Sequence, residues 1–120
     1  MSTLKVDNLL NAAGNESPIS VPGAAKAWVK FNGTGTIAIN DSFNVTSLTD
    51  HGTGQYSANF TNAMANANYA VAGMASDSGS ASVVALSWES STTSAVRVQC
   101  IRSSTGFSDQ GIVNVVVFGG

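Results

Sequence analysis

Two glycine-rich stretches are the first candidates for chemistry in this chain, Gly33-Thr34-Gly35 and His51-Gly52-Thr53-Gly54. A dinucleotide-binding loop needs a third glycine three residues further on and a helix behind it. Position 38 is Ala38, and the sequence around it, TIAIN, has the character of a strand. A phosphate loop needs Lys followed by Ser or Thr after its last glycine, and neither stretch has this. Both stretches are therefore predicted to be turns, and no cofactor is expected.

Catalytic residue types are sparse. His51 is the single histidine, and a Ser-His-Asp site is formally possible with Asp50 or Asp41. However, no serine lies in the G-x-S-x-G pattern of a nucleophile elbow. The acidic residues are scattered, whereas a glycosidase needs two carboxylates about 5–10 Å apart. The sequence predicts a protein that is not an enzyme, with a depolymerase as the weakest alternative.

Metal-binding patterns are equally sparse. The sequence has no calcium-loop pattern and no Cys/His zinc spacing, so no metal site is expected and His51 is predicted to be a solvated turn residue. One alternative is that three copies of His51 meet on a threefold axis and bind a metal. The single cysteine, Cys100, excludes an intrachain disulfide, and its strand-like surroundings predict a buried side chain.

Composition narrows the class of protein. Charged residues make up only 10% of the chain, against about 25% in ordinary soluble domains. Ser, Thr, Asn and Gly supply 50 of the 120 residues, and the five basic residues are scattered. No nucleic-acid partner is expected without a basic patch. The N-terminus does not resemble a secretory signal, and no apolar run approaches the ~20 residues of a membrane span. We therefore expect synthesis in a cytoplasm and no membrane insertion.

The chain divides into two parts. Residues 1–23 contain both prolines, Pro18 and Pro22, and are predicted to form an extended N-terminal arm and linker. Residues 24–120 contain about eight short runs rich in β-branched and aromatic residues, separated by turn-forming residues at spacings typical of a sandwich or barrel. We predict an all-β domain, an antiparallel β-sandwich of jelly-roll-like type. Residues 61–68 could hold one helical turn.

Alternation within the runs predicts which side chains share a face. Ala27, Val29 and Phe31 are expected to face the core, with Trp28 and Lys30 on the other side. Tyr56, Ala58 and Phe60 are also expected to share one face. In the run FNVTSLTD, Phe43 and Val45 are placed on one face, and Asn32-Gly33 is predicted to form a two-residue hairpin turn.

The final run, IVNVVVF, is apolar on both faces. Val113, Val115 and Val117 lie on one side, and Ile112, Val116 and Phe118 lie on the other. A strand that is apolar on both sides is buried on both. This favours one face against the core and the other against a neighbouring subunit.

The residues with a candidate binding role follow from these faces. Trp28, Lys30 and Trp88 are expected to lie at a subunit interface or to stack on a glycan. The apolar residues of the arm are candidates for anchoring the protein to an assembly, namely Leu4, Val6, Leu9 and Leu10.

The segment AKAWVKFNGTGTIAINDSFNVTSLTDHGTGQYSANFTNAMANANYAV resembles a segment of tail-fibre and other appendage proteins of tailed bacteriophages. The matching positions include Ala27-Trp28-Val29, Phe43-Asn44-Val45 and Ser47-Leu48-Thr49-Asp50. The start, STLKVDNLLNAAG, resembles the opening of structural proteins from marine and cyanobacterial phages. Together these resemblances cover residues 1–13 and about 24–72.

The resemblance implies a virion protein, usually a homotrimer, with a structural or receptor-binding role. Most proteins of this kind are long fibres, whereas here the domain has only a short arm. A tail fibre, knob or similar appendage subunit is therefore expected, assembled in the host cytoplasm alongside other virion proteins. The alternatives are a capsid decoration or cement protein and a carbohydrate-binding module that recognises a host surface glycan.

Overall fold

The computed structural model describes residues 24–76, 84–103 and 105–119, which form nine strands in two antiparallel sheets. The arm, residues 1–23, lies outside the described residues, together with its candidate anchors Leu4, Val6, Leu9 and Leu10. The strands are β1 (Ala25–Asn32), β2 (Ala38–Phe43), β3 (Val45–Gly52), β4 (Gln55–Phe60), β5 (Ala70–Ser76), β6 (Val84–Ser91), β7 (Ala95–Arg102), β8 (Gly106–Phe107) and β9 (Ile112–Phe118).

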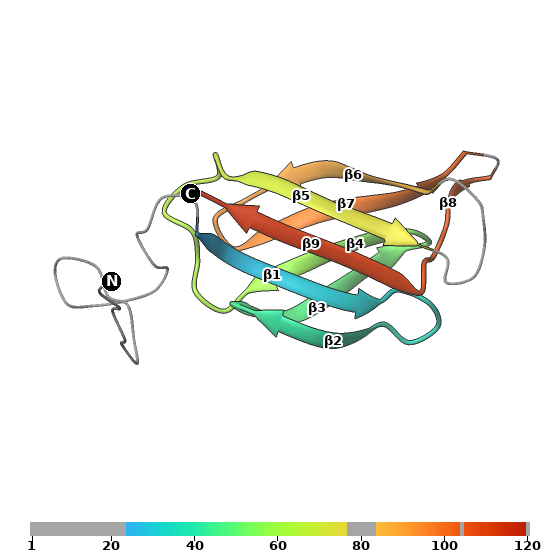
Figure 1. The fold of residues 1–120 in the computed structure, drawn as a ribbon, viewed down its shortest axis with the longest axis horizontal. Helices are drawn as coiled ribbons and strands as arrows, with labels where there is room; N and C mark the ends of the chain where they lie inside the picture. The colour runs from blue at the N-terminus through green and yellow to red at the C-terminus, as the bar shows by residue number, and fades with distance from the viewer. Residues whose placement is uncertain (1–23, 77–83, 104, 120) are drawn as a thin grey trace, which may run out of the picture.

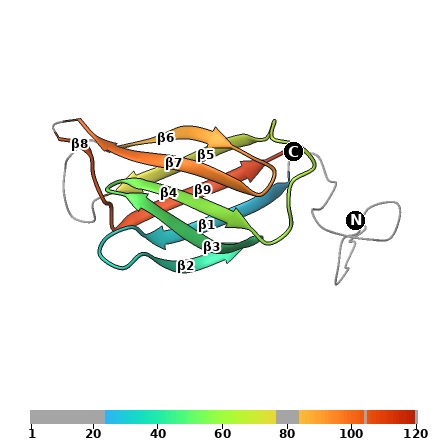
Figure 2. The same ribbon diagram turned by 180° about the vertical axis from the view of Figure 1, so that it is seen from behind.

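The two sheets pack face to face as a sandwich (Figures 1 and 2). Sheet A has the order β2-β1-β9-β5, and sheet B has the order β3-β4-β7-β6, with the short β8 paired to β7. The predicted antiparallel β-sandwich is confirmed. The sequence predicted about eight strands, and the described residues form nine. The additional strand, β8, has only two residues, which are too few to show an alternating pattern. No helix in the described part of the chain is long and apolar enough to cross a membrane.

The core lies between the sheets and follows the predicted alternation. Ala27, Val29 and Phe31 of β1 are buried, as are Tyr56, Ala58 and Phe60 of β4 and Val113, Val115 and Val117 of β9. Cys100 is also buried, as predicted. Two aromatic pairs meet edge to face, Phe31 of β1 with Tyr56 of β4 at 5.2 Å between centroids, and Phe60 of β4 with Tyr69 of the loop before β5 at 5.7 Å. Such pairs add to the free energy gained from burial alone.

The chain changes sheets at Asn44, and this corrects one prediction. Phe43 ends β2 in sheet A and Val45 begins β3 in sheet B, so the two do not share a face as expected. Asn44 makes the corner with a positive φ of 56°, a conformation that Asn tolerates better than most residues. Its side-chain nitrogen donates to Lys26 O and Asn62 O, both at 3.1 Å, and its oxygen accepts from Asn62 N at 2.8 Å.

The predicted two-residue turn at Asn32-Gly33 is wrong. β1 ends at Asn32 and β2 begins only at Ala38, and in the loop between them Gly35, not Gly33, has a positive φ, of 58°. A contact with a distant part of the chain explains the difference. Gly33 N donates to Gln110 O at 2.8 Å, so Gly33 is held by the segment before β9 and does not form a local hairpin turn. The helical turn considered for residues 61–68 is also absent, and this segment is an irregular loop.

Candidate functional site

The two glycine-rich stretches meet in a structural network. Tyr56 Oη lies 2.8 Å from both Gly33 O and Asp109 Oδ1, and Gly54 N donates to the same Asp109 oxygen at 2.8 Å. Burial, reinforced by the Asp109 carboxylate, raises the pKa of the Tyr56 hydroxyl well above its usual range. One glycine from each stretch thus supports a buried tyrosine. Gly33-Thr34-Gly35 lies in the loop after β1, as predicted, whereas His51 and Gly52 belong to strand β3 and only Thr53-Gly54 forms a turn.

A Cβ at either glycine would collide with this network. At Gly33 it would lie 2.5 Å from Tyr56 Oη, and at Gly54 it would lie 2.7 Å from Cys100 O. Gly54 also has a φ of +68°, which side chains rarely adopt. Packing requires glycine at both positions, and the positive φ is a second requirement at Gly54.

His51 lies on the outer side of sheet B. Its Nε2 is 2.7 Å from Ser57 Oγ, while Asp50 Oδ1 accepts from Gly52 N at 2.9 Å. Asp41, the other candidate triad member, is on β2 in the opposite sheet, where it pairs in register with Lys30. The structure therefore does not bring Asp41 to His51. Among the described residues, no group of three His, Cys, Asp or Glu side chains could hold a metal ion.

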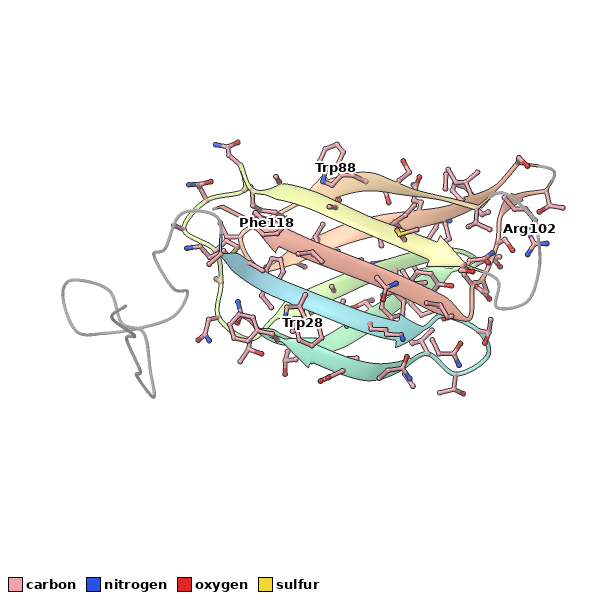
Figure 3. All side chains as sticks on the ribbon, viewed as in Figure 1. Trp28, Trp88, Arg102 and Phe118 are labelled. Atoms are coloured by element: carbon pink, nitrogen blue, oxygen red, sulfur yellow. The ribbon has the colours of Figure 1, made fainter. Side chains whose placement is uncertain are left out.

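Trp28 occupies the centre of an apolar row across sheet A. It pairs in register with Phe43 on one side and Val116 on the other, and Val116 pairs in turn with Ala72. Because directly opposed side chains in a sheet are neighbours about 5 Å apart, the four side chains form one continuous stripe over all four strands. Figure 3 shows Trp28 on the face of sheet A that is turned away from the core.

Further apolar side chains extend this stripe. On one side of the stripe, Phe118 pairs with Ala70. On the other side of the stripe, Met74 pairs with Asn114. Phe43 is 41% exposed, Phe118 38% and Met74 73%. We call the outward side chains of this surface the apolar face of sheet A: Trp28, Phe43, Ala70, Ala72, Met74, Val116 and Phe118. Lys30, predicted to lie beside Trp28, is exposed on the same side.

The outer side of sheet B is different in character. Asn59 Nδ2 donates to Ser47 Oγ and Thr49 Oγ1 at 3.1 and 3.0 Å, and Arg97 forms an ion pair with Glu89. Its larger apolar side chains, Ile101 and Phe107, oppose each other at the end where β8 pairs with β7. Sheet B therefore presents polar side chains to water, whereas sheet A presents a surface that water solvates poorly.

Trp88 forms a second exposed site at the open edge between β5 and β6. It pairs with Val98, whose side chain is in the core, so Trp88 projects from the side of sheet B that faces sheet A. It is nevertheless 58% exposed, because the edge strand continues beyond the cover of sheet A. Figure 3 shows the ring at the edge of the sandwich. A cleft of about 340 Å³ lies here, lined by Ala67, Asn68, Tyr69, Val71, Trp88 and Ser91.

Several residues of these surfaces were not identified from the sequence. Phe43 was placed on the wrong face because the Asn44 corner was not recognised. Tyr69 and Asn68 lie in the loop before β5. This loop approaches the end of β6 through contacts such as that of Tyr69 with Thr92, 23 positions further along the chain, which local sequence does not predict. Met74 lies on a strand so rich in Ala and Gly that its alternation is weak. The sequence did single out Trp28, Lys30, Trp88 and the apolar second face of IVNVVVF.

Comparisons of the chain with protein-family models, with characterised proteins and with solved structures found no match. The two surfaces are therefore interpreted from their own chemistry.

Proposed function

We propose that this protein is a non-enzymatic structural subunit of a tailed-bacteriophage virion, assembled as a homotrimer in a short tail fibre, knob or similar appendage. The observation that supports the proposal is the apolar face of sheet A, centred on Trp28. Large exposed apolar patches on small proteins mark interaction surfaces, and this one spans every strand of a sheet. The resemblance of the segment around Trp28 to phage appendage proteins supplies the class of assembly.

The size of the face suits contact with further copies of the chain. The longest strand, β1, has eight residues, so the four-stranded sheet measures about 26 by 19 Å, or about 500 Å². In a trimer the three faces together bury about 1,500 Å², or about 500 Å² for each pair of subunits, so each contact is small and all three form together. In a trimer, the three faces would surround the threefold axis and each would contact both neighbours.

Solution mass tests the self-association. We expect light scattering coupled to size exclusion to give three times the 12.2 kDa of one chain at micromolar concentration. Phe43→Ser changes a residue of the apolar face and should shift the protein toward monomer. The substitution removes the apolar contact area of the phenyl ring, and the new hydroxyl would lose its hydration in the interface. Phe107→Ser is the matched control, since Phe107 is similarly exposed, at 47%, but lies on sheet B.

Two results would overturn the assembly proposal. One is a wild-type protein that stays monomeric at micromolar concentration. The other is a Phe107→Ser variant that dissociates as readily as Phe43→Ser. For the role in the virion, mass spectrometry of purified phage particles from the source culture should detect the chain, and antibody labelling should place it on the tail. Labelling of the capsid would instead favour the decoration-protein alternative.

A further inference from the structure

The cleft at Trp88 has the construction of a small binding site. Trp88 Nε1 donates to Ser91 Oγ at 2.7 Å, which fixes the orientation of the ring. The Ser91 hydroxyl lies beside that of Tyr69, and Tyr69 Oη in turn donates toward Thr92 O and Ala95 O at 2.8 and 2.9 Å. The hydrogen bond to Ser91 holds the exposed ring beside the anchored Tyr69, so the ring does not need to be ordered when a ligand binds.

The surface that the ring offers is purely aromatic. The single polar atom of the indole is already engaged with Ser91, so the exposed remainder of Trp88 can make apolar and π contacts only. The cleft is also lined by the half-buried, apolar Val71 and the exposed Asn68. The Asn68 side chain makes no hydrogen bond to any other described residue, so its amide can both donate and accept.

None of the described residues that line the cleft is charged. The nearest charge along the strand, Glu89, forms an ion pair with Arg97 on the outer side of sheet B. A charged ligand would therefore lose hydration in this cleft without gaining a counter-charge. The volume of about 340 Å³ is at the lower end of the range for small-molecule sites.

We infer that this cleft binds a neutral pyranose unit of an oligosaccharide, with an apolar C–H face of the sugar stacked on Trp88 and a hydroxyl group hydrogen-bonded to Asn68. A pyranose has such a face bordered by hydroxyl groups that both donate and accept, which matches a fixed indole beside a free amide. The inference is independent of self-association through sheet A, because Trp88 lies on a different surface. For a single sugar ring we expect a Kd of the order of 1 mM.

Nuclear magnetic resonance provides a direct test, because the chain has two tryptophans and hence two indole N–H signals. The probes are the methyl glycosides of glucose, galactose and mannose, together with N-acetylglucosamine and N-acetylgalactosamine, each added to the ¹⁵N-labelled full chain well above the expected Kd. At least one should shift the Trp88 indole signal in a saturable way and leave the Trp28 signal in place. Glucuronic acid and N-acetylneuraminic acid, which are charged, should bind at least tenfold more weakly.

Variants separate binding from folding. Trp88→Ala should abolish the saturable shift of the Asn68 side-chain amide, Trp88→Phe should retain part of it, and Ser91→Ala should weaken the affinity severalfold by releasing the ring. Phe107→Ser, which alters an exposed aromatic ring outside both surfaces, should bind as the wild type does. The inference is overturned if no neutral saccharide moves the Trp88 signal. It is also overturned if charged sugars bind equally well, or if the Trp88 signal responds only to protein concentration, which would make the cleft a contact between copies.

Discussion

Replacing Gly33 with alanine would place a methyl group against the hydroxyl of Tyr56. The added Cβ would lie 2.5 Å from Tyr56 Oη and 2.7 Å from its Cζ, an overpacking that costs about 1–3 kcal/mol. Tyr56→Phe removes Oη together with its contacts to Gly33 O and Asp109 Oδ1, both at 2.8 Å. Because one of these partners is a carboxylate, we expect that change alone to cost about 2 kcal/mol.

The double variant should be less damaged than the sum of the two single variants. Once Oη is gone, the closest atom to the new methyl group is gone too, although Cζ and Gln110 O remain within 3.0 Å. Relief is therefore partial, and we expect a coupling of about 1 kcal/mol in the free energy of unfolding. Urea denaturation of the four proteins, followed by tryptophan fluorescence with the m-values compared, measures this coupling.

Gly35→Ala is the control for this cycle. Gly35 has a φ of +58°, and a methyl group added there would meet no atom within 4 Å beyond its own chain neighbours, so alanine there costs about 1–2 kcal/mol from the backbone alone. That cost should add to the cost of Tyr56→Phe. If the costs of Gly33→Ala and Tyr56→Phe also add to within ~0.5 kcal/mol, the two residues do not compete for one space and the reasoning fails.

Four further outcomes can be measured. Asn44→Ala should cost about 2–3 kcal/mol in urea denaturation, because it loses the corner hydrogen bonds at a positive φ, whereas Asn44→Gly keeps the φ and should cost less; equal losses would contradict this. Burial and the nearby Asp109 charge raise the pKa of the Cys100 thiol from 9.0 to about 11, so its contribution to stability is complete below pH 9 and falls as the pH rises toward 11. Cys100→Val should therefore flatten the decline in stability between pH 9 and 10, by up to about 1.4 kcal/mol per pH unit, and an unchanged slope would refute the assignment. Glu89→Gln breaks the partly exposed pair with Arg97 and should change stability by less than about 1 kcal/mol without changing the oligomer mass. Deleting residues 1–23 should leave the cooperative unfolding of the sandwich intact and abolish incorporation into virions; normal incorporation would refute an anchoring role for the arm.

Alternation of apolar residues was sufficient to predict the sandwich, because each long strand has one face in the core. The buried faces of β1, β4 and β9 follow directly from it. What failed depends on contacts between distant residues. The loop after Asn32 is set by two hydrogen bonds of Gly33, which donates to Gln110 O and accepts from Tyr56 Oη, and a local turn preference cannot anticipate them.

The candidate surfaces were predictable to different degrees. Trp28 was placed on the outer side of its strand, and the structure confirms that position. Its neighbour Phe43 was not, since a strand that changes sheets at one residue looks in sequence like a continuous run. Trp88 is exposed although it lies on the inner side of an edge strand. Its exposure depends on how far sheet A extends over sheet B, and the sequence of β6 carries no information about that.

The in-register pairing of Ala25 with Phe118 has a mechanical consequence. The first and last strands of the sandwich are antiparallel neighbours, so the sandwich begins and ends at the same pole (Figure 1). Tension applied between these two ends would open the β1–β9 ladder one rung at a time instead of shearing all rungs together. The same closeness of the ends makes the sandwich suitable for grafting into a surface loop of another protein, where it would stand as a side branch that leaves the path of the host chain almost unchanged.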